Sequence, residues 1–275
     1  MTNAAVVGHV EWIRFARVDH VPAPGEIIHT DETWEEPAGG GAVAAAQLAK
    51  LGGSCTLFTA LGDDEVGHRV PEALADHGVR VEAVFRPTFQ RRGFVFLDAG
   101  GERTITVLGD RLGPNGDDPL PWEELDGTDA VYLTAGDDAA IRRARGARAL
   151  VATARVFADL ARARVPLDAL VGSAVDPSER VDPAGIEPAP NLMVLTAGAA
   201  GGTFQRPGEP PHAYAAAPLP GPVADAYGCG DSFAAGLAFG LGTGQDAQAA
   251  VDLAARCGAA CLTGRGPYAG QLRLT

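Results

Sequence analysis

Lysine is nearly absent from this sequence, because Lys50 is the only one among 275 residues. A phosphate-binding loop of the P-loop type needs a Gly-Lys-Ser or Gly-Lys-Thr segment, so that class of nucleotide-binding protein is excluded. Positive charge is scarce in general, with 22 lysines and arginines against 35 aspartates and glutamates, and a net charge of −13. Nucleic-acid binding draws on basic groups, so it is not expected. An anionic substrate would need a local positive site.

Long apolar runs are missing as well, since no stretch approaches the ~20 residues that a membrane span requires. The segment MTNAAVVGHVEW at the start of the sequence has no basic residues followed by a long apolar run, so nothing suggests export. The cysteines form no Cys-x-x-Cys pair and have no histidine at metal-binding spacing, which predicts reduced, buried thiols at Cys55, Cys229, Cys257 and Cys261. These absences predict a soluble cytoplasmic protein without a membrane partner.

Apolar strands that end at glycine alternate with helical patterns along most of the chain. AAVVGHV, SCTLFTALG and DAVYLTAG have the strand pattern, whereas GAVAAAQLAKLG and VGHRVPEALADHGV have apolar residues at helical spacing. This alternation predicts an α/β fold with a mostly parallel sheet and helices on its faces. Residues 25–41 and 91–109 instead alternate apolar and polar residues, which predicts a small antiparallel accessory sheet.

The segment ADAYGCGDSFAAGLAFGLG, residues 224–242, carries the clearest chemical signal. The backbone amides of Gly228, Cys229 and Gly230 at the start of a helix would form an anion site. Asp231 beside such a site makes sense as a base that takes a proton from a hydroxyl attacking phosphorus, which is the division of roles in phosphoryl transfer. An ordinary helix cap at Asp231 is the alternative for this tetrapeptide taken alone.

Four segments together resemble the ribokinase (PfkB) family of carbohydrate and nucleoside kinases over nearly the whole chain. VVGHVEW followed by VDHVPAPGE resembles the first strand and the approach to the lid, and GGGAVAAAQLAKLG resembles the glycine-rich amino-terminal signature. TALGDDEVG matches the Gly-x-Asp-x-x-Gly turn of the family. VLTAGAAGG followed by DAYGCGDSFAAGL resembles the ATP-site strand and the carboxy-terminal signature, with Asp225, Gly228, Gly230, Asp231 and Phe233 in register.

The resemblance implies one ribokinase-like domain over residues 1–275, a three-layer α/β/α sandwich with a small antiparallel β lid at about 12–38 and 91–108. It implies transfer of the ATP γ-phosphate to a hydroxyl of a sugar or sugar-like alcohol, with Asp231 as general base and Gly228, Cys229 and Gly230 as anion hole. Thr196, Gly198 and Gly201 would lie along the nucleotide. Asp225 would lie near a monovalent cation such as K⁺, and the lid would pair with a second subunit in a homodimer.

Two regions depart from the family pattern. The Asn-x-x-Glu motif that organises Mg²⁺ corresponds to Ser173 and Asp176, so Asp176 is the candidate metal ligand and a helix cap at Ser173 is the alternative. The positions that correspond to substrate contacts are Glu11, Ile13, Gly39, Gly40 and Val43. Unpaired sugar hydroxyls against Ile13 and Val43 would cost about 1–3 kcal/mol each, which opens the site to a larger or partly apolar acceptor such as a nucleoside.

Further polar residues near these segments have two interpretations each. Glu11 is a better candidate than His9 for a polar contact with the acceptor, because a lone histidine on a strand is more often structural. Arg91 and Arg92 could bind an acidic group of the substrate, or they could be a solvated pair. A nucleoside kinase and a catalytically weakened, metabolite-binding member are alternatives to a sugar kinase. A Rossmann-type dinucleotide binder is disfavoured, because no Gly-x-Gly-x-x-Gly follows the first strand.

Overall fold

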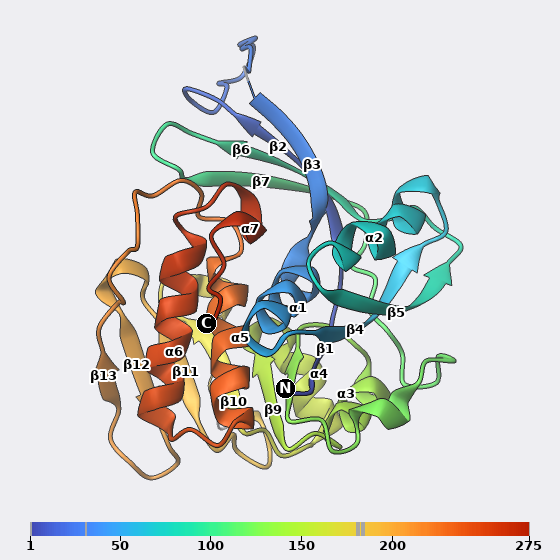
Figure 1. Ribbon diagram of the computed structural model, residues 1–275, viewed down its shortest axis with the longest axis vertical. Coiled ribbons are helices and arrows are strands. Elements are labelled where there is room, and N and C mark those ends of the chain that lie inside the picture. Colours follow the sequence, from blue (N-terminus) through green and yellow to red (C-terminus); the bar gives the residue numbers. More distant parts are fainter. Residues whose placement is uncertain (1, 31, 180–181, 183–184, 275) are drawn as a thin grey trace.

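A large twisted sheet runs through the centre of the protein. The computed structural model describes residues 2–30, 32–179, 182 and 185–274. Within them the strands of this sheet are ordered β13-β12-β11-β10-β9-β8-β1-β4-β5 (Figure 1). Neighbours from β11 to β5 are parallel, whereas β12 and β13 are antiparallel additions at one edge. The bounds are β1 Ala4–Val7, β4 Cys55–Gly62, β5 Val79–Arg86, β8 Ala130–Leu133, β9 Ala149–Thr153, β10 Ala169–Ser173, β11 Met193–Thr196, β12 Gly202–Gln205 and β13 His212–Tyr214.

Helices cover both faces of this sheet, which confirms the predicted α/β class. Alternate residues of one strand point to opposite faces, so Ala4 and Val6 of β1 belong to one apolar core and Ala5 and Val7 to the other. The first core is closed by α1 Gly39–Gly52, α2 Glu65–Ala75, α5 Cys229–Gly242, α6 Ala247–Cys261 and α7 Gly266–Ala269. The second is closed by α3 Asp138–Ala144 and α4 Phe157–Ala163. No helix in the described ranges is both long and apolar enough to cross a membrane.

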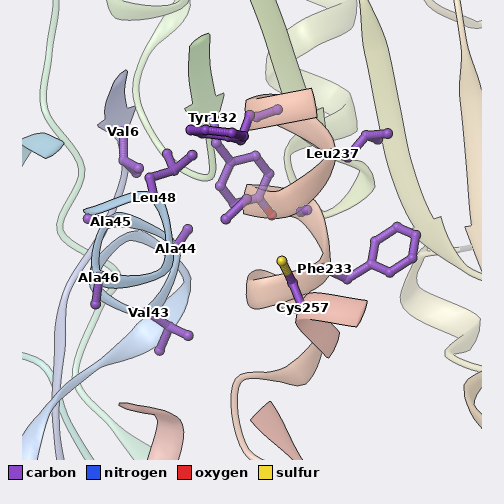
Figure 2. Close-up of a cluster of buried hydrophobic side chains, with 14 of the residues drawn as sticks. Val6, Val43, Ala44, Ala45, Ala46, Leu48, Tyr132, Phe233, Leu237 and Cys257 are labelled. Atoms are coloured by element: carbon purple, nitrogen blue, oxygen red, sulfur yellow. The ribbon is translucent and has the colours of Figure 1, made fainter. Parts of the chain in front are cut away.

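Helix α5 is held firmly within the first core. Figure 2 shows Phe233 and Leu237 of α5 in the same buried cluster as Leu48 of α1. On its other side α5 approaches α6 closely, because a methyl group at Gly236 would lie only 2.8 Å from Cys257 Sγ. The apolar sequence that begins at Phe233 is therefore a buried helix, and it gives the first turn of α5 a rigid support.

A second sheet of four strands lies above the carboxyl edge of the large sheet (Figure 1). Its order is β3-β2-β6-β7, with bounds β2 Glu11–Arg17, β3 Glu32–Ala38, β6 Arg92–Leu97 and β7 Arg103–Leu108. Its two hairpins are antiparallel as predicted, but β2 and β6 pair in parallel, so the sheet is mixed. The reason is that β2 follows β1 and β6 follows β5, and these two strands leave the large sheet in the same direction.

The lid sheet rests on the loop that leads into α5. Gly101, in the β6–β7 turn, accepts a hydrogen bond of 3.2 Å from the amide of Ala226. Arg103 Nη1 donates to the Ala226 carbonyl at 2.5 Å. The ring of Phe15, on β2, meets the ring of Tyr227 edge-on at a centroid distance of 5.2 Å. The lid and the start of α5 are therefore in direct contact.

Candidate active site

A cavity of about 240 Å³ lies between the lid and the carboxyl ends of the central strands. Parallel strands present their carboxyl ends at one edge, and ligands of open α/β sheets bind there, where the strand order reverses. In this sheet β1 is flanked by β8 on one side and β4 on the other, so the order reverses beside it. The charged and polar side chains that line the cavity are His9, Glu11, Arg91, Arg103, Arg111, Tyr132, Thr134, Thr153, Arg155, Glu179, Thr196, Tyr227 and Asp231.

The turn before α5 presents free backbone amides to this cavity. Gly228 has φ +81°, a left-handed conformation that favours glycine, and Gly228 and Gly230 both line the cavity. The first hydrogen bond of the helix runs from Ser232 N to Gly228 O, 2.9 Å. Within the described part of the chain, the amides of Cys229, Gly230 and Asp231 have no acceptor. Such amides at a helix start are a site for an anion.

Asp225 stabilises this turn through hydrogen bonds to backbone amides. It is fully buried, and its carboxylate accepts hydrogen bonds from Tyr227 N at 2.8 Å and from Gly266 N at 3.0 Å. Burial raises the pKa of Asp225, while these two amide donors lower it. Asp225 therefore connects the turn to the start of α7 rather than facing the cavity described above.

Asp231 lies in the first turn of α5 and reaches the cavity. Burial raises the pKa of this carboxyl group from its ordinary value of 3.8 to about 6, with Arg155 opposing the shift and Glu179 adding to it. A carboxylate with a pKa near the working pH is suited to accept a proton in catalysis. The sequence predicted a carboxylate beside a backbone-amide anion site at this position, and the structure adds the burial and the neighbouring Arg155.

The glycines at the start of α1 make room for this carboxylate. Gly39 has φ +82°, and its amide donates to the hydroxyl of Tyr227 at 3.3 Å. A methyl group at Gly40 would lie 2.8 Å from Asp231 Oδ1. Gly39 and Gly40 both line the cavity, so two glycine segments almost two hundred residues apart in the sequence meet at this site.

Arg155 and Glu179 form the wall on the β9–β10 side, whereas Asp176 pairs with Arg155 without being among the lining residues. Arg155 Nη2 is 3.2 Å from Asp176 Oδ2 and also pairs with Glu179 Oε1 at 2.5 Å. Glu179 is 8% exposed and lines the cavity. Ser173 Oγ accepts the amide of Asp176 at 3.1 Å. Sequence reasoning missed Arg155 and Glu179, although Glu179 follows the candidate Asp176 by three residues.

His9, Glu11 and Arg91 lie together at another part of the wall. His9 Nδ1 is 3.3 Å from Thr134 Oγ1. Arg91 Nε is 2.7 Å from Glu11 Oε1. Burial, followed by the charges of Arg111 and Arg91, lowers the pKa of His9 to about 3, so this imidazole is neutral at ordinary pH.

The two arginines singled out in the sequence separate. Arg91 lines the cavity, whereas Arg92 Nη2 pairs with Asp64 Oδ2 at 2.9 Å on a partly exposed surface. Consecutive residues of an extended segment point to opposite sides, which explains their different surroundings. Of the pair, Arg91 is therefore the one within reach of a molecule in the cavity.

The structure brings some of the remaining candidates to the cavity and keeps others away from its surface. Thr196 lines the cavity, whereas Gly198 and Gly201 lie just beyond the end of β11. Ile13 and Val43 are fully buried and are not among the residues described as lining the cavity. Ile13 covers Gly93 on β6, and Val43 packs under Gly228.

The cysteines are all free thiols, and Cys55, Cys257 and Cys261 are buried as predicted, whereas Cys229 is only partly buried. The thiol of Cys229 contacts that of Cys261, and this hydrogen bond, followed by burial, raises the pKa of Cys229. Cys229 therefore offers its backbone amide to the anion site while its side chain stays protonated. No group of three histidine, cysteine or acidic side chains suited to a metal ion is found among the described residues.

Comparisons with known proteins agree with this architecture. A ribokinase from Dictyostelium discoideum is 32% identical over 109 residues, which cover 39% of this chain and 34% of that protein. The alignment thus spans about a third of that relative. The structure of a ribokinase from Thermotoga maritima has a TM-score of 0.79 and 19% identity, covering 99% of this chain and 97% of that one. An Arabidopsis thaliana ribokinase complexed with ribose and ATP has a TM-score of 0.72 and 20% identity, covering 98% and 96%.

The likeness to these solved structures establishes a ribokinase-like fold for the chain. The sequence pattern of the family described as pfkB family carbohydrate kinase matches residues 1–154 and 167–273. This match includes the glycines before α1, the lid strands and the whole turn before α5. The chain therefore belongs to the pfkB family of carbohydrate kinases.

Proposed function

We propose that this protein is an ATP-dependent kinase that transfers the γ-phosphoryl group to a hydroxyl of a sugar or sugar-like alcohol. The observation that carries the proposal is the position of Asp231. Its carboxylate, with a pKa raised to about 6, lies in the same helical turn as the unpaired amides of Cys229 and Gly230. A base and an anion site that share one rigid turn suit a reaction in which a hydroxyl attacks a phosphoryl group.

In this reaction Asp231 accepts the proton of the acceptor hydroxyl, while the oxygen of that hydroxyl forms a bond to the γ-phosphorus. The bond from phosphorus to the bridging oxygen of ATP breaks, and ADP leaves. The amides of Gly228, Cys229 and Gly230 stabilise the negative charge on the transferred group. The charge of Arg155 opposes the upward shift of the Asp231 pKa, so this carboxyl group, with a pKa of about 6, is ionised at neutral pH.

The acceptor binds between the lid and the glycines of α1. Glu11 and the neutral His9 present hydrogen-bonding groups, and Gly39 and Gly40 let the acceptor approach the backbone. Ile13 and Val43 do not contact the acceptor in this proposal but support the residues that do. Ile13 packs against Gly93 of β6, and Val43 packs against Gly228. The lid closes the cavity on this side with three residues of β7, which are Arg103, Ile105 and Val107.

The nucleotide lies along Thr196, Gly198 and Gly201 at the end of β11. Mg²⁺ is held in proteins through one or two carboxylates, waters and the phosphates of the substrate. Asp176 and Glu179 fit that requirement, because Asp176 is partly exposed and Glu179 lines the cavity. The ion would neutralise phosphate charge there. Asp225, a buried carboxylate with one amide donor on each oxygen, is the proposed neighbour of a monovalent cation such as K⁺.

The lid is the proposed contact between two subunits. Strand β7 is the edge of the lid sheet, and each of its residues is exposed. Leu108 is 58% exposed at its end. An exposed edge strand with apolar residues tends to pair with another strand, which favours a homodimer through the lid. Light scattering on wild type and on Leu108→Lys tests this, with a dimer expected for the wild type and a shift toward monomer in the variant.

The test of the proposed activity is phosphate transfer from ATP to a panel of sugars and nucleosides, measured as ADP release that depends on the acceptor. Asp231→Asn keeps the shape of the side chain and removes the base, so acceptor-dependent ADP release should fall by about a hundredfold or more. Asp252→Asn is the matched control, because Asp252 is exposed on α6 and far along the chain from the turn. Unchanged transfer in Asp231→Asn would show that the general base is another group.

A further inference from the structure

The arginines of the cavity differ in what they bind. Arg103 donates to the carbonyl of Ala226, and Arg155 pairs with Asp176 and Glu179. Arg91 pairs with Glu11, whereas Arg111 has no ion pair or hydrogen bond to any residue that the structure describes. The cavity is lined by four arginines and three carboxylates, so it carries a positive charge in a protein whose net charge is −13.

The excess positive charge is concentrated on Arg91 and Arg111. Burial first, and then the charge of Arg91, lowers the pKa of Arg111, while Glu11 opposes this shift. Both guanidinium groups also lower the pKa of His9, after its burial. The two cations therefore both act on His9, and the carboxylates whose charges act on Arg111 are Glu11 and Asp159. Like charges repel each other, so an anion bound between Arg91 and Arg111 would be favoured.

Arg91 lines the same cavity and forms one ion pair there. Its Nε lies 2.7 Å from Glu11 Oε1, so Glu11 occupies one edge of the guanidinium group. A guanidinium presents several donors in a planar fork, which matches the oxygens of a carboxylate or a phosphate.

The other two arginines of the cavity act on the proposed base, because the charges of Arg155 and Arg103 lower the pKa of Asp231. Arg111 lines both this cavity and an adjoining one of about 440 Å³, where Arg86, Asn115 and Asp137 are among its neighbours. Arg103 and Arg155 thus serve the side where phosphate is transferred. Arg91 and Arg111 serve the side where the rest of the acceptor lies.

We propose that the phosphate acceptor carries an anionic group, a carboxylate or a phosphate monoester, which Arg91 and Arg111 bind beside His9. This inference rests on the proposed kinase function and narrows its substrate from sugars in general to sugar acids or sugar phosphates. Glu11 is a positioning residue in this scheme, because it holds Arg91 at the wall. A neutral sugar would leave the Arg111 guanidinium without an ion pair among the described residues, because Glu11 and Asp159 act on it only through their charges.

The test compares acceptors in matched sets with the full-length protein and ATP. Neutral D-glucose and D-fructose are compared with D-gluconate, which carries a carboxylate, and with D-fructose 6-phosphate, which carries a phosphate. Acceptor-dependent ADP release gives kcat and KM, and thermal unfolding without ATP reports binding alone. We expect either D-gluconate or D-fructose 6-phosphate to have a KM at least about tenfold below that of the corresponding neutral sugar, D-glucose or D-fructose. The set that does so identifies the anion.

Variants then connect this preference to the residues. Arg111→Gln should raise the KM for the anionic acceptor by about tenfold to a hundredfold, with a smaller change for the neutral sugar. Arg111→Lys should restore part of the loss, because it keeps the charge without the fork. Arg92→Gln is the control, since Arg92 pairs with Asp64 outside the cavity, and its KM should stay within about twofold of wild type.

The outcomes separate this inference from the kinase function. Phosphorylation of neutral sugars with a KM equal to or below that of the anionic ones would overturn the inference and leave the kinase function intact. An Arg111→Gln variant with an unchanged KM for an anionic acceptor would also overturn it. Thermal stabilisation by an anionic acceptor that is lost in Arg111→Gln, without any turnover, would support the inference and count against the kinase function. No stabilisation and no turnover with either anionic set would overturn the inference.

Discussion

Gly40 lies directly against the carboxylate of Asp231, so close that a methyl group on Gly40 would come within 2.8 Å of Asp231 Oδ1. The two residues belong to helices at opposite ends of the sequence, α1 and α5. The space around the proposed base is therefore set by a glycine nearly two hundred residues away, and this contact gives a direct test of how the base is positioned.

Gly40→Ala should displace the Asp231 carboxylate while the fold persists, because the clash is with the end of a side chain. A base moved by about 1 Å loses on the order of a hundredfold in kcat. Steady-state kinetics measure this loss, and thermal unfolding should show a shift of at most about 3 °C. Gly221→Ala is the control, because the nearest atom to its added methyl would be 3.7 Å away. Wild-type kcat in Gly40→Ala would contradict this role.

The pH dependence of kcat/KM should follow the ionisation of Asp231. Its pKa is raised to about 6, and a base acts in its deprotonated form, so activity should rise with pH to a plateau above about 6. His9, with a pKa lowered to about 3, stays neutral in this range, and the charged groups that act on Asp231 are Arg155, Glu179, Arg103 and Glu11. A rate profile from pH 5 to 8 measures the midpoint. A midpoint near 4 would show that Asp231 is not desolvated.

Asp231→Asn should stabilise the folded protein at neutral pH. A folded-state pKa above the unfolded value of 3.8 means that the folded protein binds the proton more tightly, so stability falls as the pH rises from about 4 to 6. Removal of the charge should therefore raise the free energy of unfolding by at most about 3 kcal/mol above pH 6. Urea unfolding of the wild type and of Asp231→Asn at pH 7.5 and pH 4 measures this difference, and the gain in the free energy of unfolding should disappear at pH 4. An equal gain at both values would point to packing instead.

Arg103→Gln should weaken the contact between the lid and the turn before α5. Arg103 is the lid residue that donates to the Ala226 carbonyl, and it also lines the cavity. Loss of a charged donor should lower kcat/KM by about tenfold. Arg14→Gln is the matched control, because Arg14 is also on the lid but pairs with Glu35 on an exposed surface. Equal effects of the two substitutions would mean that lid stability alone is affected.

Local sequence patterns were enough to predict the turn at Gly228–Asp231 and the alternation of strands and helices. Glycine spacing and apolar periodicity act over a few residues, so they can be recognised without knowledge of the fold. The alternation of apolar and polar residues predicted a small accessory sheet, the family resemblance identified it as a lid, and the structure has a four-stranded sheet there. The parallel pairing of β2 with β6 could not be predicted, because it depends on the directions of β1 and β5 in another sheet.

The side chains that line the wall of the cavity were harder to predict than Asp231, the proposed general base. Arg155 and Arg111 resemble many other arginines in the sequence, and only the order of strands in the large sheet brings them to one cavity. Glu179 follows Asp176 at the spacing of the Asn-x-x-Glu motif, but this signal was missed because the motif was matched to Ser173 and Asp176. Ile13 and Val43 were predicted from positions that correspond to substrate contacts in the family. The side chain of Ile13 instead packs against Gly93, and that of Val43 packs against Gly228, which sequence position alone does not reveal.

Ala226 is held by the lid on both of its backbone groups, through Gly101 O and Arg103 Nη1, only two residues before Gly228. A displacement of the lid would remove both of these contacts at once. The position of the lid and the conformation of the turn at Gly228 are therefore mechanically coupled, and the proposed anion site at the start of α5 depends on both.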